Sequence, residues 1–271
     1  MSEADIPRER VEDALFRAGY WLVFAVLMLP IVVVFVTSFQ QSSYLTFPPS
    51  GYTLEWYAQF FGSEEWLGAV RDSLAIGVGA SLLATVLGVT GSLAVQRSDS
   101  RVAKLLPPVV LLPLLIPPVV LGLTLLIYFN RVGLTNSYVN IVVAHTLWAT
   151  PLVFFIMQSV FARFDWNLRD AGMDLGARPS RVFYHVILPN VRSGVVIAAV
   201  VAFIVSLQEF IMALFLKSFE VKTVPVLAWT SLQSSLSPMV SVVSAFLVLT
   251  SILGVLLSAA VMNLEWLAEQ L

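Results

Sequence analysis

The chain has 271 residues, of which 58% are hydrophobic and only 12% are charged. Soluble domains carry about 25% charged residues, so this composition excludes a water-soluble domain and predicts a protein that is solvated mostly by lipid. The net charge of -2 with dispersed basic residues excludes a nucleic-acid-binding stripe, and the absence of cysteine excludes disulfides, thiolate metal sites and a cysteine nucleophile.

Six apolar stretches are long enough to cross a bilayer, for which a helix needs about 20 apolar residues. In chain order they cover residues 20–39, 73–95, 105–129, 138–161, 193–216 and 239–262. Three connecting stretches, residues 41–68, 162–192 and 217–238, are long enough to hold small elements of their own. We therefore predict an all-α polytopic membrane protein with six transmembrane helices.

The basic residues predict how these helices are oriented, because Lys and Arg collect in the short cytoplasmic flanks of membrane helices. Eleven basic residues lie in segments 1–19, 96–104 and 162–192, whereas only three lie in the connections on the opposite side. We therefore expect both termini to be cytoplasmic. The predicted organisation is the N-terminal segment 1–19, a transmembrane domain at 20–262 and a cytoplasmic tail at 263–271.

The third predicted span is rich in proline, with Pro107, Pro108, Pro113, Pro117 and Pro118. Each proline removes a backbone hydrogen bond and bends a helix. Two interpretations stay open. Membrane helices tolerate proline because their neighbours satisfy the freed carbonyl groups, and a bent helix can also line a transport path.

The cytoplasmic loop at residues 162–192 combines charged residues with a helical periodicity of apolar ones. Gly176 allows a tight turn and Pro179 can begin a helix. The apolar positions on either side of this break are Leu168, Ala171, Leu175, Val182 and Val186. We predict two short amphipathic helices joined by a sharp turn, which would protrude from the membrane as an element that another protein can grip. A plain interfacial loop is the alternative.

The same loop carries a family resemblance. Asp170-Ala171-Gly172, then three residues, then Gly176, and later Ile187-Leu188-Pro189, resembles the EAA signature of ATP-binding-cassette (ABC) importer permeases. Asp170 stands where the family has Glu, and Gly172 where it has a second Ala. The resemblance implies a type I importer permease fold whose coupling helix sits in a cleft of a separate ATPase. The residues that it assigns to this contact are Arg169, Asp170, Ala171, Gly172, Asp174, Gly176 and Arg178.

A second run, Ser206-Leu207-Gln208-Glu209-Phe210, is similar to a Ser-Leu-Asp-Asp-Phe stretch of spermidine and putrescine permeases, with one acid fewer. The resemblance implies an importer for a polyamine or a related small organic cation. Permeases for phosphonate, opine, thiamine or ferric iron look alike and stay open as alternatives.

The resemblance also implies a location in the inner (cytoplasmic) membrane and partners for this chain. The partners are an ATPase dimer, a second homologous permease subunit, and a solute-binding protein that docks on loops 41–68 and 217–238. The sequence has no GxxxxGK[ST] phosphate loop and no catalytic constellation, so we expect a non-enzymatic subunit that binds no cofactor. The partner ATPase would bind ATP and Mg²⁺. A stand-alone secondary transporter is the rival class, but the inverted repeats and ion-binding acids it requires are not evident.

Glu209 is the one acidic residue clearly inside a predicted span, and such a residue faces either the bundle interior or water. It either attracts a cationic cargo in the path or pairs with a partner subunit. Helical spacing places further polar and aromatic side chains on shared faces, His145 with Trp148 and Thr124 with Tyr128. Together with Gln208, the predicted path residues are Thr124, Tyr128, His145, Trp148, Gln208 and Glu209.

Overall fold

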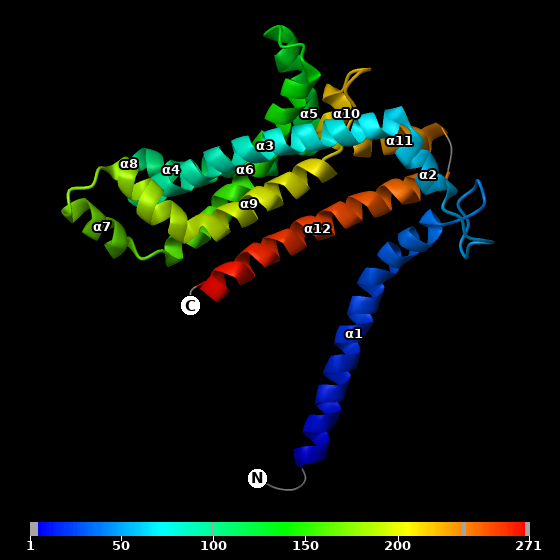
Figure 1. Cartoon of the computed structure of the whole chain (residues 1–271), viewed down its shortest axis with the longest axis horizontal. Coiled ribbons are helices and arrows are strands. Elements are labelled where there is room, and N and C mark those ends of the chain that lie inside the picture. Colours follow the sequence, from blue (N-terminus) through cyan, green and yellow to red (C-terminus); the bar gives the residue numbers. More distant parts are fainter. Residues whose placement is uncertain (1–4, 99, 235–236, 269–271) are drawn as a thin grey trace. The chain divides into compact units, whose positions relative to one another are not determined.

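The computed structural model describes the fold of residues 5–98, 100–234 and 237–268, and most of this part of the chain is helical (Figure 1). Its described residues form no β-strand, only an isolated antiparallel β-bridge between Gln40 and Tyr52. The chain forms two compact units, residues 1–62 with 231–246 and residues 63–230 with 247–271. The predicted all-α class is confirmed.

The first unit contains α1 (Asp5–Ser38), α2 (Glu55–Gly62) and the beginning of α12 (Met239–Ala268). Hydrogen bonds at the end of α1 join the three helices of this unit. Ser38 Oγ lies 2.7 Å from Tyr57 Oη on α2, and Thr37 Oγ1 donates to Ser241 Oγ on α12 at 3.0 Å. α1 continues through most of the predicted N-terminal segment, and α12 continues into the predicted tail, whose residues 269–271 lie outside the described chain.

The second unit is built on three long helices that run side by side, α3 (Glu64–Arg97), α6 (Ser137–Arg163) and α9 (Leu188–Gln208) (Figure 1). Glycine makes the close approach possible. A Cβ at Gly88 on α3 would lie 2.5 Å from Val153 on α6, and a Cβ at Gly194 on α9 would lie 2.5 Å from Val160 on α6. Small residues at helix contacts are typical of membrane bundles, where packing rather than hydrophobic burial drives association.

The predicted third span is a broken helix. α4 (Arg101–Leu115) and α5 (Pro118–Arg131) meet at an angle of 98°. Proline drives the residue before it out of the helical region, and Ile116 and Pro117 accordingly have extended ψ values of 128° and 133°. The predicted bend is therefore present. Among the described residues, five helices can span a membrane, or six when this bent pair counts as one span.

The predicted fifth span is also interrupted, and the prediction of one continuous helix over residues 193–216 is wrong. α9 ends at Gln208, and the short helix α10 (Ile211–Leu216) begins after a break of two residues. At its other end the spanning helix is longer than predicted. α8 (Pro179–Val182) continues through a π-helix, η1 (Phe183–Ile187), directly into α9. α11 (Val224–Ser234) follows α10 within the last long loop.

Candidate functional site

The predicted helix–turn–helix at residues 162–192 is present as α7 (Trp166–Asp174), a turn, and α8. Gly176 closes the turn in the left-handed region at φ 82°. Its N–H donates to the carbonyl of Met173 at 2.9 Å, and the N–H of Ala177 donates to that of Gly172 at 3.2 Å. This is a Schellman motif, for which glycine is the preferred residue. The second helix does not stand alone as predicted, because α8 runs on into α9.

Two contacts hold α7 on the bundle. A Cβ at Gly172 would lie 3.3 Å from Val182 Cγ2, so glycine allows α7 to approach α8 closely. At the beginning of α7, the Trp166 ring lies 5.0 Å from the Phe164 ring, and the Arg97 guanidinium lies 5.1 Å from the Trp166 ring centroid. Arg97 is the last residue of α3, so α7 is attached to the end of the bundle.

The rest of α7 faces outward. None of its residues is buried, and Leu175 beside the turn is 89% exposed. Asp170, Ala171, Asp174 and Arg178 are exposed, and Arg169 is half-buried and pairs with Asp170 at 2.6 Å. The predicted contact residues therefore lie together on one protruding segment, with Gly172 and Gly176 shaping it. An unburied apolar and charged face of this kind is suited to binding another protein.

Glu209 lies at the break between α9 and α10 and is 9% exposed. Its Oε1 accepts a hydrogen bond from Met212 N at 3.0 Å and its Oε2 accepts one from Ala213 N at 3.1 Å. The carboxylate thus satisfies two N–H groups at the beginning of α10 that have no partner within the helix. His145 Nε2 on α6 lies 3.2 Å from Glu209 Oε2, and His145 Nδ1 lies 2.7 Å from Ser206 Oγ. Glu209 therefore has a structural role within this chain.

A cavity of about 420 Å³ opens beside this carboxylate. Its lining residues are Trp148, Val205, Gln208, Glu209, Phe210 and Ile211. Three predicted path residues therefore meet here, while His145 is buried at 1% exposure and contacts Glu209. Thr124 and Tyr128 lie exposed on α5 and do not line this cavity.

Phe210 was missed in the sequence, although it lines the cavity and its ring lies 5.4 Å from that of Trp229. The apolar run from Phe210 to Leu216 gives no sign that the helix is interrupted there. An indole, a phenyl ring and a carboxylate around one hollow are chemically suited to an organic ammonium ion, because the faces of aromatic rings attract cations.

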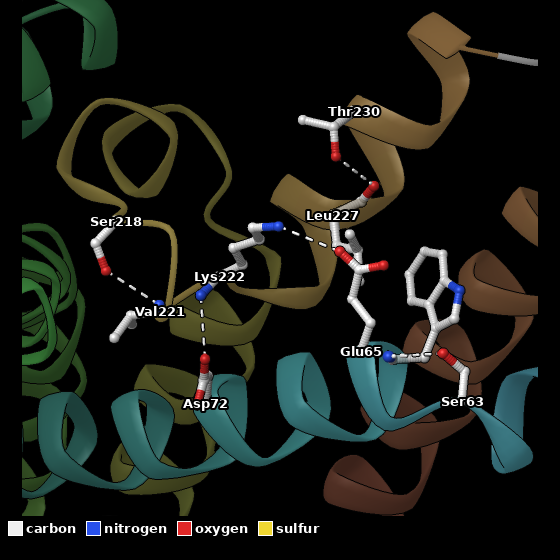
Figure 2. A network of polar contacts seen from close by, with 9 residues as sticks. Ser63, Glu65, Asp72, Ser218, Val221, Lys222, Leu227 and Thr230 are labelled. Atoms are coloured by element: carbon white, nitrogen blue, oxygen red, sulfur yellow. Dashed lines mark hydrogen bonds and ion pairs between the residues drawn. The ribbon is translucent and has the colours of Figure 1, made fainter.

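A second polar cluster lies near the beginning of α3 (Figure 2). Asp72 is only 8% exposed, accepts a hydrogen bond from Tyr138 Oη, and accepts another from Lys222 N at 3.1 Å. Ser73 Oγ accepts from Val224 N at 2.8 Å. These side chains tie the segment between α10 and α11 to α3 and α6. They were not predicted from the sequence, where their only signal is a polar pair at the very start of an apolar run.

The Asp72 cluster and the attachment of α7 lie at opposite ends of the bundle. Asp72 is near the beginning of α3, whereas Arg97, which contacts Trp166 at the beginning of α7, is at the end of α3. The helix between them is about 38 Å long at 1.5 Å per residue. This exceeds the hydrocarbon thickness of about 30 Å, so α3 is long enough to place the Asp72 cluster and the α7 segment at opposite faces of a bilayer.

Residues 80–264 match the family described as "Binding-protein-dependent transport system inner membrane component", and the chain belongs to this family. It is a multi-pass inner-membrane permease subunit of an ABC importer. Among its relatives, the spermidine/putrescine transport system permease protein PotC of Haemophilus influenzae is 25% identical over 245 residues, 90% of this chain and 95% of that protein. The putrescine transport system permease protein PotI of Escherichia coli K12 is 26% identical over 233 residues, 83% of each chain.

Solved structures support the fold. A bacterial ABC transporter involved in the import of the acidic polysaccharide alginate aligns with a TM-score of 0.69 at 14% identity, over 97% of this chain and 98% of that chain. The MetNI methionine ABC transporter aligns with a TM-score of 0.63 at 17% identity, over 74% of this chain and 98% of that chain. Both likenesses concern the fold alone.

Proposed function

We propose that this permease couples ATP hydrolysis by a separate ATPase to the import of a polyamine or a related small organic cation. The coupling to an ATPase is supported by one observation, the outward-facing α7 segment that ends in a hydrogen-bonded turn. α7 buries none of its residues in this chain, and its Schellman turn presents Leu175 to solvent. In this proposal the segment around Arg169, Asp170, Ala171 and Asp174 sits in the ATPase cleft on the cytoplasmic side.

The ATPase would bind the ATP and Mg²⁺ and transmit its closure through this segment. α8, η1 and α9 form one continuous helical run from Pro179 to Gln208, so a displacement at α7 would be carried along α9 to the cavity beside Glu209. The proposed assembly contains two ATPase subunits, a second homologous permease and an external solute-binding protein. Both termini of this chain would then be cytoplasmic.

The cavity beside Glu209 supports the cargo part of the proposal. Trp148 and Phe210 supply aromatic faces, and Gln208 adds an amide whose Nε2 donates to Ser251 Oγ at 3.0 Å. The Glu209 carboxylate gives the hollow a negative wall, although its oxygens also accept bonds from α10. The proposed path extends over the exposed face of α5 with Thr124 and Tyr128, where a second permease subunit would close it.

Uptake by reconstituted transporter tests this proposal. Proteoliposomes that contain the whole complex and its binding protein should accumulate labelled spermidine or putrescine only with ATP on the ATPase side. Trp148→Leu should lower uptake by about tenfold, because a desolvated cation–π contact contributes roughly 1–2 kcal/mol. Phe155→Leu is the control, since Phe155 is also on α6 but does not line the cavity. Cation uptake by the chain alone, without an ATPase, would instead establish a stand-alone secondary transporter.

A further inference from the structure

A short turn between α10 and α11 holds an aromatic side chain almost completely in solvent. Phe219 is 98% exposed. The turn is closed on both sides of it, because Ser218 N donates to the Val221 carbonyl at 3.2 Å and Val221 N donates to Ser218 Oγ at 3.1 Å. Phe219 therefore sits at the tip of a defined turn rather than on an open loop.

The base of this turn is fixed to the bundle (Figure 2). The buried carboxylate of Asp72 accepts from Lys222 N at 3.1 Å, and the Lys222 ammonium donates to Glu65 Oε1 at 3.2 Å. Val224 N donates to Ser73 Oγ at 2.8 Å. A turn whose backbone is fixed before binding loses less conformational entropy on association, so an aromatic side chain at its tip is well placed to act as a binding anchor.

The surroundings of Phe219 are acidic. A hollow of about 240 Å³ beside it is lined by Glu64, Glu65, Asp72, Glu220 and Lys222, among other residues. Glu64, Glu65 and Glu220 are exposed, and the one lysine already pairs with Glu65. The anchor therefore stands within a rim that carries a net negative charge.

The chemistry of this surface limits what can bind it. Anionic lipid headgroups and a second copy of the same acidic surface would both be repelled by the carboxylates. The ATPase would bind at α7, at the other end of α3. A protein that binds at this end of the bundle and presents an apolar socket surrounded by basic residues would complement both the Phe219 side chain and the acidic residues around it.

We propose that Phe219 and the acidic rim of Glu64, Glu65 and Glu220 form a docking surface for the external solute-binding protein, and that this partner presents an apolar socket surrounded by Lys or Arg. The inference rests on the proposed function, which requires such a partner on the side opposite α7. It specifies the residues of the contact and the sign of the charge on each side.

Photo-crosslinking in cells tests this docking surface. A benzophenone amino acid placed at position 219 in the full complex should, after irradiation, form an adduct that mass spectrometry identifies as a solute-binding protein. The double variant Glu64→Lys/Glu220→Lys should lower the adduct yield by about tenfold, because like charges across an interface are strongly unfavourable. It leaves the pair of Lys222 with Glu65 intact. Glu64→Asp/Glu220→Asp, which keeps both charges, should retain the adduct.

A second label separates this inference from the proposed function. The same benzophenone at Leu175 should crosslink to the ATPase. If it does so while position 219 yields only lipid, a second permease, or a binding-protein adduct that is indifferent to charge reversal, the docking surface is refuted and the coupling role stands. If position 175 yields no ATPase adduct, the proposed function itself is contradicted.

Discussion

The connecting segments at the two ends of the bundle of α3, α6 and α9 are held in different ways. At one end, buried Asp72 and its neighbour Ser73 accept hydrogen bonds that fix the backbone of the segment from Lys222 to Val224. At the other, α7 is anchored at Trp166 and by the close approach of Gly172 to α8, and the rest of it faces solvent. At the first end the connecting segment is fixed by buried side chains of the chain itself, whereas at the second most of α7 is left unburied.

Labelling of single cysteines gives the largest contrast between the two ends. The chain has no cysteine, so Phe219→Cys and Leu175→Cys each create one exposed thiol. We expect a membrane-impermeant maleimide to label Phe219→Cys in intact cells and to label Leu175→Cys only after the cells are permeabilised, because the proposed orientation puts the α7 end of α3 in the cytoplasm and the Phe219 end outside. The reverse pattern would overturn the proposed orientation.

Glu209→Ala should be the most destabilising substitution in the bundle. It would remove the acceptor of two α10 N–H groups and the partner of His145. Breaking a buried pair costs about 3–5 kcal/mol, and thermal unfolding in detergent would measure the loss. Gln208→Ala is the matched control on the preceding residue, because Gln208 is exposed. Equal losses for both variants would refute the capping role of Glu209.

A pair of aspartates compares the two ends directly. Asp72→Ala should lower the free energy of unfolding by about 1–3 kcal/mol, because it removes a buried carboxylate that accepts hydrogen bonds from the Lys222 N–H and the Tyr138 hydroxyl. Asp174→Ala, in the exposed α7 segment, should leave the thermal midpoint unchanged while weakening ATPase binding. A stability loss at Asp174 as large as that at Asp72 would contradict the difference between the two ends.

The smallest effect is expected for Gly172→Ala, which restores the residue of the family signature. The gain in helix propensity is about 1 kcal/mol, and it opposes a Cβ contact of 3.3 Å with Val182, so the net change in stability should be less than about 1 kcal/mol. Gly88→Ala is the same change on α3, where the Cβ would lie 2.9 Å from the backbone nitrogen of Phe154. It should cost about 1–3 kcal/mol. Similar thermal midpoints for both variants would contradict the close α3–α6 packing.

The structural features that were predicted best from the sequence are those that depend on single residues. Gly176 and Pro179 were sufficient to predict the helix–turn–helix, because a positive φ and a helix start are properties of single residues. The prolines of the third span predicted a bend. Its angle of 98° could not be predicted, since proline identity shows that hydrogen bonds are lost but not where the chain then runs.

Tertiary contacts explain what the sequence did not reveal. The break after Gln208 depends on a carboxylate that caps α10 and contacts His145 on α6, 64 positions earlier in the chain. Helical spacing placed Thr124 and Tyr128 on one face, but the bend between α4 and α5 decides what that face meets. Asp72 gave no distinctive signal because its partners come from α6 and from the segment before α11.

The most direct test of the account is whether an ATPase depends on the Gly176 turn for binding. Gly176 and Gly133 both have positive φ, 82° and 74°, and neither has a neighbour within 4 Å of an added Cβ. Gly176→Arg and Gly133→Arg therefore impose the same backbone strain, about 1–2 kcal/mol, in two different turns.

After mild solubilisation, the native chain and Gly133→Arg should co-purify with an ABC ATPase. For Gly176→Arg, the amount of co-purified ATPase should fall by at least about tenfold, because a loss of 1.4 kcal/mol of binding free energy lowers the affinity tenfold. The variant should still insert into the membrane. If Gly176→Arg retains as much ATPase as Gly133→Arg, or if the native chain purifies without an ATPase, the coupling role of this segment is wrong.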